Sequence, residues 1–423
     1  MKFAVDSVAK SGARIGCLTD FSRIPQASFE TPLLLLHTRG GSVPHLSYDI
    51  LQMVTKEHHI FQTPLVTLID STESIKALGK GLAEFTGLKE YLNFATVQDS
   101  GTSTPQGYHD KKSVSLWTRG GRKLIDPHIY MSSIEILKPD IYQLLADGDA
   151  TMDSSLKRLK KSVDATVNFA EQCHSFRKKS EVLKDTPVFA SIVGGYNMSE
   201  RLRCIKSLNE FEVSGYILDG FHTNGDSATN LKWEDVEPVL TDTLAALSNN
   251  NPRVFLGALE PLTVLKMVSK GIDIFDATYP WTVAERGGAL TFPNSIHPII
   301  SQTNQVTETL PNINEMPSGN KKSRNDETEA IITRTARCYE ISLKDKKFFD
   351  DFQPLADTCD CYCCRKYSRA YVHHLMTTGE LLGPLLLMMH NLHHYLTFFR
   401  NIRLAIKDNQ LEAFEKRLQD STN

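Results

Sequence analysis

The sequence predicts an α/β fold, a (β/α)₈ barrel of the TIM type that carries a zinc-binding module at its C-terminal end. Two observations lead to this prediction. Short apolar runs alternate with amphipathic helices through the middle of the chain, and four cysteines fall within six positions near its end. Repeated β-α-β units form right-handed crossovers and a parallel sheet. The chain has 423 residues, enough to close such a sheet into a barrel of ~250 residues. An open doubly wound sheet is the alternative.

The N-terminal third supplies the first strands of this pattern. Leu33 to Leu36 are four consecutive leucines, which is typical of a strand that is buried on both faces. Residues 72–86 place apolar side chains at helical spacing, and a polar loop follows at 99–107. The strands of this part are expected at 3–5, 14–18, 33–36 and 94–97.

From residue 187 onward the alternation of strands and helices is regular. Strands are expected at 188–193, 215–218, 253–256 and 272–275, and helices at 199–211, 233–248 and 261–271. Residues 1–292 are therefore predicted to form the main part of the barrel.

The segment 293–336 interrupts the pattern with four prolines, many Asn, Thr and Ser residues and few apolar ones. A segment without apolar periodicity cannot bury a core, so we predict a flexible surface insertion. Its basic piece, 321–324, could touch RNA, although a solvated linker is the simpler interpretation. Residues 337–423 are expected to complete the barrel and to form the zinc module.

Composition limits the classes of partner. Hydrophobic residues make up 41% of the chain, and the net charge of −3 leaves no overall basic field for nucleic acid. Any RNA contact must therefore be a local patch. The four cysteines outside the cluster are scattered, which suits a reducing compartment. No secretory signal is read at the N-terminus, and the apolar run 381–389 is too short to span a bilayer.

The cysteine cluster predicts a metal site. Cys359, Cys361 and Cys364 form C-x-C-x-x-C, and 25 residues separate Cys364 from His390. Three thiolates and one imidazole complete a tetrahedral zinc shell, and four protein ligands mark a structural site. We expect one zinc ion per chain. Cys363 is a spare thiol that could replace Cys364, and buried free cysteines are the alternative interpretation.

A family resemblance rests on this region. The segments Cys359–Cys364, Ser368–Leu375, Gly379–Gly383 and His390–Leu392 together resemble the zinc-binding module of tRNA-guanine transglycosylases. These enzymes exchange guanine in a tRNA anticodon for queuine or its precursor. The resemblance implies the same barrel fold independently of the strand pattern.

The resemblance also points to two carboxylates. The run Gly271 to Asp276 is similar to the family's G-V-D-M-F-D, whose final Asp is the nucleophile that bonds C1′ of the ribose. A carboxylate suits this role because it can attack an anomeric carbon and leave again. Asp99 begins Asp99-Ser100-Gly101, which resembles the start of D-S-G-G-Y-Q, whose Asp is a general acid/base. Without the resemblance, Asp276 would be read as a strand-end residue that caps a loop.

The segment after Asp276 departs from the family pattern. Active members continue C-V-x-P-T-R-x-x-R-x-G, and the two arginines hold the anticodon loop. Here Thr282 and Glu285 stand at the arginine positions, and Arg286 is shifted by one. Since phosphate contacts dominate RNA affinity, their loss argues against independent catalysis.

The base-reading positions are degraded as well. Asp147 matches the guanine-reading Asp of F-D-E only approximately, Gly194 replaces the amide of Q-Q-G, and Gly220 keeps only a backbone position. A polar pocket loses its discrimination when its hydrogen-bonding groups are missing. The substrate-binding residues are therefore left unassigned.

An intact zinc module beside a degraded pocket resembles the non-catalytic accessory subunits of eukaryotic queuine tRNA-ribosyltransferase. This resemblance implies a heterodimer with a catalytic subunit, tRNA bound through the complex, exchange at the wobble position, a cytoplasmic location and peripheral association with the mitochondrial outer membrane. Asp276 and Asp99 would then be vestigial, and self-association is a further expectation. Two alternatives stay open: an active transglycosylase that uses Asp276, and a zinc-stabilised binding protein outside queuosine chemistry.

The expected contact with a partner is an aromatic and apolar stripe of the C-terminal module. Aromatic residues are enriched at the centres of interfaces. The stripe consists of Tyr371, His373, His374, Leu385 to Met389, His393, His394 and Tyr395.

Overall fold

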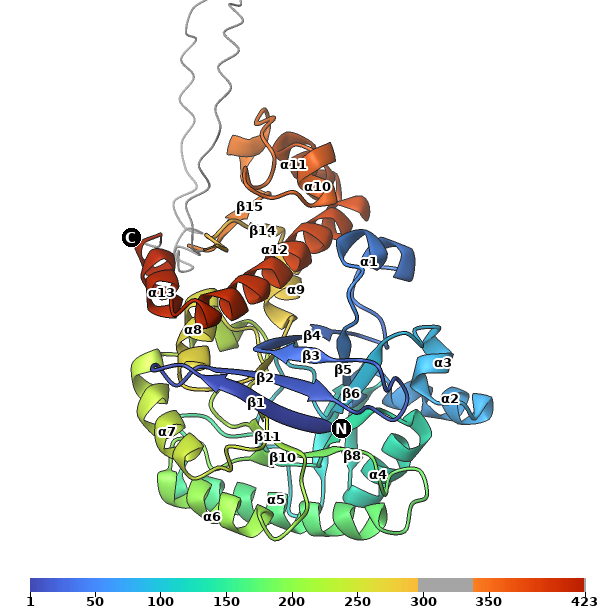
Figure 1. Cartoon of the computed structure of the whole chain (residues 1–423). Helices are drawn as coiled ribbons and strands as arrows, with labels where there is room; N and C mark the ends of the chain where they lie inside the picture. The colour runs from blue at the N-terminus through green and yellow to red at the C-terminus, as the bar shows by residue number, and fades with distance from the viewer. Residues whose placement is uncertain (296–337, 422–423) are drawn as a thin grey trace, which may run out of the picture.

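The computed structural model describes residues 1–295 and 338–421, and its centre is a closed barrel of eight parallel strands (Figure 1). The order around the barrel is β10-β11-β12-β13-β4-β5-β6-β9, and every neighbouring pair is parallel. The predicted barrel is confirmed, and the open doubly wound alternative is wrong. The barrel strands are β4 (Leu33–His37), β5 (Ile60–Pro64), β6 (Leu92–Thr96), β9 (Ile141–Gln143), β10 (Val188–Ile192), β11 (Gly215–Leu218), β12 (Arg253–Val254) and β13 (Ile274–Asp276).

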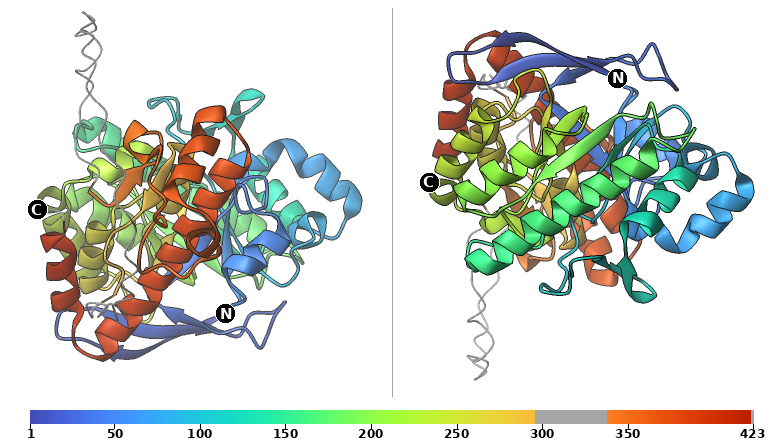
Figure 2. Two further views of the ribbon diagram at one scale, coloured as in Figure 1. Left: turned by 90° about the horizontal axis from the view of Figure 1, so that it is seen from above. Right: turned by 90° about the horizontal axis from the view of Figure 1, so that it is seen from below.

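Helices follow the strands and form the outer layer (Figures 1 and 2). They are α1 (Tyr48–Val54), α2 (Thr72–Leu78), α3 (Leu82–Thr86), α4 (Pro127–Leu137), α5 (Leu156–Arg177), α6 (Met198–Leu208), α7 (Trp233–Ala245), α8 (Pro261–Ser269) and α9 (Thr278–Glu285). Short 3₁₀ turns lie at η1 (Leu65–Thr67), η2 (Ile69–Ser71), η3 (Asp226–Asn230) and η4 (Lys346–Phe348). A hairpin of β7 (Val114–Thr118) and β8 (Gly121–Ile125) lies between β6 and α4.

The leucine-rich strand β4 shows why both faces of the barrel wall are apolar. Leu33 and Leu35 belong to the cluster inside the barrel, whereas Leu34 and Leu36 pack in the layer between strands and helices. All five residues of β4 are buried. Burial of each leucine side chain contributes roughly 1.5–3 kcal/mol to stability. Strand β4 is therefore stabilised by apolar contacts on both of its faces.

The N-terminal sheet covers one end of the barrel. Strands β1 (Lys2–Val8), β2 (Arg14–Thr19) and β3 (Phe29–Thr31) pair antiparallel. Leu18, Phe21 and Phe29 share the inner cluster with first residues of barrel strands such as Leu33. The sheet therefore closes the N-terminal end of the barrel, and the opposite end, where active sites of this fold lie, carries the connecting loops.

The predicted helix at 72–86 is instead two helices, α2 and α3. Gly79 and Gly81 have φ angles of 73° and 83°, a left-handed conformation that glycine adopts without a Cβ penalty. Gly79 ends α2 as its C-cap, and the chain re-enters a helix only after Gly81. The helical spacing of apolar residues continues across this break, but the backbone is not helical at Gly79 and Gly81.

The C-terminal part adds outer elements to the barrel. Strand β14 (Gly288–Leu290) pairs with β15 (Glu340–Ser342), and four helices follow: α10 (Tyr362–Lys366), α11 (Arg369–Thr378), α12 (Leu382–Lys407) and α13 (Leu411–Asp420). All eight barrel strands already lie between residues 33 and 276. The segment expected to complete the barrel therefore contributes helices to its outside. The predicted insertion 293–336 lies, from residue 296 on, outside the described residues. In the described part of the chain, no helix is both long and apolar enough to cross a bilayer.

Candidate functional site

The structure brings the four predicted metal ligands together. Their ligand atoms lie within 4.8 Å of one another. His390 Nδ1 is 3.6 Å from Cys359 Sγ, 3.5 Å from Cys361 Sγ and 3.3 Å from Cys364 Sγ. In a tetrahedral zinc site with the usual bond lengths, a sulfur and a nitrogen ligand are about 3.6 Å apart. The cluster therefore has the size and the ligand set of a Cys₃His zinc shell.

The surroundings of the cluster suit a structural metal site. His390 is fully buried, and its Nε2 lies 2.8 Å from the carbonyl oxygen of Leu290, the kind of partner that fixes a metal-binding tautomer. Cys361 caps α10, where its Sγ accepts a hydrogen bond from the backbone N–H of Cys364. Cys363 is buried outside the cluster, which contains Cys364.

Helix α12 ties the metal cluster to the barrel. Asn391, next to His390, donates to the carbonyls of Pro280 and Gly288 and accepts from the N–H of Leu290. All of these groups are buried. The segment that follows the barrel strand β13 is therefore held by the same helix that carries the histidine ligand.

Asp276 is the last residue of β13, at the C-terminal end of the barrel, as predicted. Its side chain is buried, and protein groups donate to both carboxylate oxygens. Oδ2 accepts from Ser100 Oγ at 2.7 Å and from the Gly257 N–H at 3.2 Å, and Oδ1 accepts from the Thr278 N–H at 3.2 Å. Burial raises the pKa of this carboxyl, although the nearby His37 and the hydrogen bonds from Ser100 and Thr278 act in the opposite direction.

Trp281 packs over this part of the barrel end. A Cβ at Gly101 would lie 2.1 Å from its ring, so the indole rests directly on the loop that carries Ser100. The ring also stacks on His37, with centroids 5.1 Å apart, and Arg39 lies over its face at 4.9 Å. The indole N–H donates to Glu285, which lies 2.6 Å from His45 Nε2. Trp281 is thus fixed by contacts with Gly101, His37, Arg39 and Glu285.

Asp99 is engaged in the same network. It is buried and accepts hydrogen bonds from the Gly101 N–H and from Thr102 Oγ1. His37 Nε2 lies 3.4 Å and Arg39 Nε 3.3 Å from its carboxylate. Asp99 therefore contacts its own loop, His37 and Arg39, where a general acid/base would need to face a substrate.

The positions of the expected anticodon clamp have other partners. Thr282 is buried, and its hydroxyl donates to the Tyr279 carbonyl. Glu285 binds Trp281 and His45, as described above. Arg286 forms ion pairs with Asp226 at 2.8 Å and with Glu340 at 2.7 Å. The shifted arginine is thus engaged inside the chain and does not replace the missing clamp.

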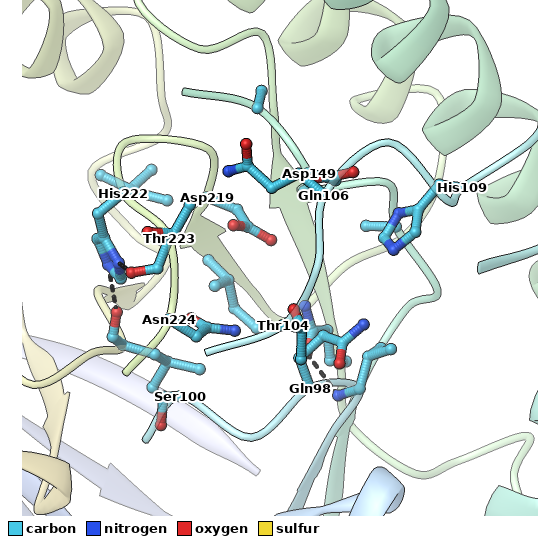
Figure 3. A pocket seen from close by; sticks show the side chains of 18 of the residues that line it. Gln98, Ser100, Thr104, Gln106, His109, Asp149, Asp219, His222, Thr223 and Asn224 are labelled. Carbon is cyan, nitrogen blue, oxygen red and sulfur yellow. Dashed lines mark hydrogen bonds between the residues drawn. The ribbon is translucent and has the colours of Figure 1, made fainter. Parts of the chain in front are cut away.

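A cavity remains beside this network (Figure 3). Its volume is about 90 Å³, room for roughly six waters at about 15 Å³ each. Ser100 lines this cavity, and Asp276, which accepts a hydrogen bond from Ser100, is not among the lining residues. The other polar lining residues include Gln98, Gln106, Gln143, Asp149, Asp219, His222 and Asn224.

Asp147, the approximate match to a guanine-reading residue, does not face this cavity as a free carboxylate. Arg158 binds it with two N–H groups, and His109 Nδ1 lies 3.0 Å from Oδ1. Burial alone would raise the pKa of Asp147, but the hydrogen bonds from His109 and Arg158 outweigh it and lower the pKa. Its acceptor capacity is used within the protein, so the expected partial match does not extend to base recognition.

A buried guanidinium shapes the floor below the cavity. Arg201 is completely buried and donates to the carbonyls of Ile192, Gly195 and Asp219. Gly194 leaves no room for a side chain, because a Cβ there would lie 2.8 Å from the backbone of Arg201. The backbone of Arg201 therefore packs too close to Gly194 for the amide side chain of the family motif to fit there.

The partner stripe predicted in the C-terminal module is wrong for most of its residues, because His373, Leu386 to Met389, His394 and Tyr395 are all buried. His394 and Tyr395 are 2% and 1% exposed. His394 Nε2 lies 2.9 Å from the Phe292 carbonyl oxygen, and the Tyr395 hydroxyl donates to Leu259. Helix α12 is covered along most of its length, so its aromatic residues serve the core.

Sequence reasoning missed the residues that surround Asp276: His37, Arg39, Gln62 and Trp281. Gln62 lies 3.1 Å from His37 Nδ1 and donates to Ser100. One signal was present, because His37 is a polar residue that closes a run of four leucines at a strand end. The position of Trp281 depends on loop packing, which no local pattern encodes.

Comparison with known proteins fits this arrangement. The profile of the family described as queuine tRNA-ribosyltransferase matches residues 9–423. Proteins named queuine tRNA-ribosyltransferase accessory subunit 2 are similar over nearly the whole chain. The Aedes aegypti protein is 34% identical, covering 99% of this chain and 92% of its own. The Danio rerio protein is 36% identical with 98% of both covered, and the Xenopus tropicalis protein 35% identical with 100% of both covered. The chain belongs to the queuine tRNA-ribosyltransferase family.

Proposed function

We propose that this chain is the non-catalytic accessory subunit of a heterodimeric queuine tRNA-ribosyltransferase, which supports the exchange of guanine for queuine at the wobble position of tRNA. The observation that carries the proposal is the enclosed state of Asp276. The relatives reported above are named accessory subunits, and this chain is similar to them over nearly its whole length.

The chemistry explains why enclosure matters. A carboxylate nucleophile must come within about 3–3.5 Å of the ribose C1′ with a free lone pair. Asp276 instead accepts hydrogen bonds from Ser100, Gly257 and Thr278, and Trp281 of helix α9 packs on the loop that carries Ser100. A partner subunit would then have to supply the reactive carboxylate.

The metal in this proposal is one structural zinc ion per chain, held by Cys359, Cys361, Cys364 and His390. Bound zinc would contribute folding free energy, because its four ligands come from a loop and a distant helix. No ligand position is left for a substrate, so zinc has no part in base exchange.

The surface proposed for the catalytic subunit lies on the same C-terminal module. Phe349, Phe352 and Leu381 are 77%, 79% and 88% exposed, and Tyr371 is 40% exposed. Exposed apolar side chains mark an interaction site when they form a contiguous patch, and the proposal is that these four residues contribute to one. These four residues replace His394 and Tyr395 as the expected partner contact.

The test of the function compares the chain with and without a catalytic subunit, using tRNA that carries labelled guanine at the wobble position. We expect label release by the pair and none by this chain alone. Steady release by the isolated chain, abolished in Asp276→Asn, would establish the active-enzyme alternative. A chain that neither pairs nor alters the partner's exchange rate would contradict the accessory role.

The test of the contact surface is Phe352→Glu. We expect this variant to lose copurification with the catalytic subunit while its metal content and melting temperature stay unchanged. Phe85→Glu, on helix α3, removes another exposed aromatic residue (41% exposed) and serves as the matched control. Retained pairing of Phe352→Glu would place the interface elsewhere.

The expected location is the cytoplasm with peripheral association at the mitochondrial outer membrane. This is a prediction from the family resemblance alone, and fractionation of cells that express the tagged chain tests it. Recovery only in the soluble fraction would contradict the membrane association.

A further inference from the structure

A basic groove lies on helix α5, outside the barrel end described above. Its volume is about 670 Å³, and its lining residues are Lys111, Leu156, Lys157, Lys160, Lys161, Asp164, Ala165 and Asn168. Four of these eight residues are lysines, in a chain whose net charge is −3. The groove is therefore a local positive region on a protein without a general basic field.

The lysines form one stripe. Lys157, Lys160, Lys161, Asp164 and Asn168 are spaced by three, one, three and four residues along α5, which places them on one face of the helix. Lys111 comes from the loop between β6 and β7. Lys157 lies three and four residues before Lys160 and Lys161, and like charges at these spacings destabilise a helix.

Two acids near the groove are paired with arginines, and a third, Asp110, lies within electrostatic reach of Lys161. Asp164 pairs with Arg203 at 2.6 Å, and Asp147 is held by Arg158. Within residues 1–295 and 338–421, none of the four lysines forms an ion pair. Lys161 Nζ reaches only a carbonyl, that of His109, at 3.3 Å. The positive charge of the groove is therefore available to a ligand.

The groove is connected to the cavity at the barrel end through His109. His109 lines the cavity of Figure 3, and its carbonyl accepts from Lys161 in the groove. Arg158, one turn earlier on α5, binds Asp147 beside that cavity. The groove and the cavity therefore meet at His109.

We propose that the α5 groove binds the phosphate backbone of tRNA, through Lys111, Lys157, Lys160 and Lys161. Lys157 to Lys161 cover about 6 Å of helix axis, and a nucleic-acid strand carries one phosphate per about 3.4 Å of its axis. The stripe therefore matches about two consecutive phosphates. These contacts would compensate for the cations missing at Thr282 and Glu285. The proposal rests on the proposed function, because it assigns the surface through which this subunit holds RNA.

The experiment uses the full chain paired with its catalytic subunit and a tRNA with guanine at the wobble position. The double variant Lys157→Gln/Lys160→Gln should lower tRNA affinity about tenfold at 0.15 M salt and reduce the slope of log K against log salt by about 2, one unit for each phosphate contact. Lys178→Gln/Lys206→Gln removes the same charge from exposed positions outside the groove and should change neither quantity. Melting temperature and copurification with the catalytic subunit are measured for every variant.

The outcomes separate this inference from the proposed function. Normal tRNA binding by the groove variant in an intact pair would overturn the inference and leave the accessory role standing. Equal losses in the groove and control variants would show a general charge effect and also overturn it. Loss of pairing in the groove variant without RNA would make the groove a protein contact, against the proposal. Failure of the wild-type chain to pair at all would contradict the function itself.

Discussion

Replacing Asp276 by Asn tests whether this carboxylate takes part in chemistry or only in packing. Asn keeps the shape of the side chain but turns one acceptor oxygen into a donor. Its carbonyl oxygen can still accept from Ser100 and Gly257, while its NH₂ would then face the N–H of Thr278. One buried backbone donor loses its acceptor, which costs about 1–3 kcal/mol.

The effect on the melting temperature follows from the size of the chain. An unfolding entropy of about 2.1 cal/mol/K per residue gives about 0.9 kcal/mol/K for 423 residues. Asp276→Asn should therefore lower the melting temperature by about 1–3 °C. Asp273→Asn is the matched control, because Asp273 is a buried carboxylate that binds Arg14 at the N-terminal end of the same strand region. The Asp273→Asn variant should be less stable than the wild type, but its rate of guanine exchange should not change.

The pH dependence of this difference has a defined sign. The unfolded pKa of an Asp is about 3.9, and burial raises the pKa of Asp276 in the folded protein. The folded state then binds the proton more tightly, so this carboxyl stabilises the fold fully below its unfolded pKa and loses that contribution as pH rises through its folded pKa. Asn does not titrate. The melting-temperature gap between wild type and Asp276→Asn should be largest in acid and shrink toward neutral pH.

The decisive assay is guanine exchange by the reconstituted pair with Asp276→Asn in this chain. We expect a rate within twofold of the wild-type pair. A loss of exchange beyond tenfold, with the pair intact and Asp273→Asn unaffected, would refute the argument that the enclosed carboxylate is inert. A melting-temperature gap that widens toward neutral pH would refute the burial argument.

Three further outcomes follow from the same structure. Cys361→Ser should bind less zinc, measured by metal analysis, and should lose the folded C-terminal module. Cys363→Ser, which lies outside the ligand set, should keep one zinc per chain. Equal zinc loss in both variants would contradict the assigned shell. Tyr395→Asp buries a charge in the core and should destabilise by about 4 kcal/mol or more in denaturant titration; a fully stable variant would show that α12 has an exposed face there. Arg201→Met leaves three buried carbonyls without their donor and should cost about 3 kcal/mol or more in the same titration, and an unchanged midpoint would contradict this.

Much of the metal centre could be predicted from the sequence alone. Cys359, Cys361 and Cys364 are close in the chain, so their approach to one metal requires only a short loop. His390 lies farther away, and it was predicted as the fourth ligand because three thiolates and one imidazole complete a tetrahedral shell. The structure then supplied the partner of its second nitrogen, Leu290, which is 100 residues distant and outside any local pattern.

The barrel was predictable for a related reason. Short apolar strands and amphipathic helices follow from periodicity, and Asp276 falls at a strand end by counting. Breaks such as Gly79 and Gly81 were less clear, because helical spacing of apolar residues continues across them.

The sequence therefore determined the fold class, the metal ligands and the absence of arginines at positions 282 and 285. Only the tertiary structure decided that Asp276 is enclosed, that Asp147 is bound by Arg158, and that His394 and Tyr395 belong to the core. Each of these outcomes depends on which distant side chains fill the space around a group. Burial and hydrogen bonding set the reactivity and exposure of a residue, and both arise from contacts between segments that periodicity and spacing do not connect.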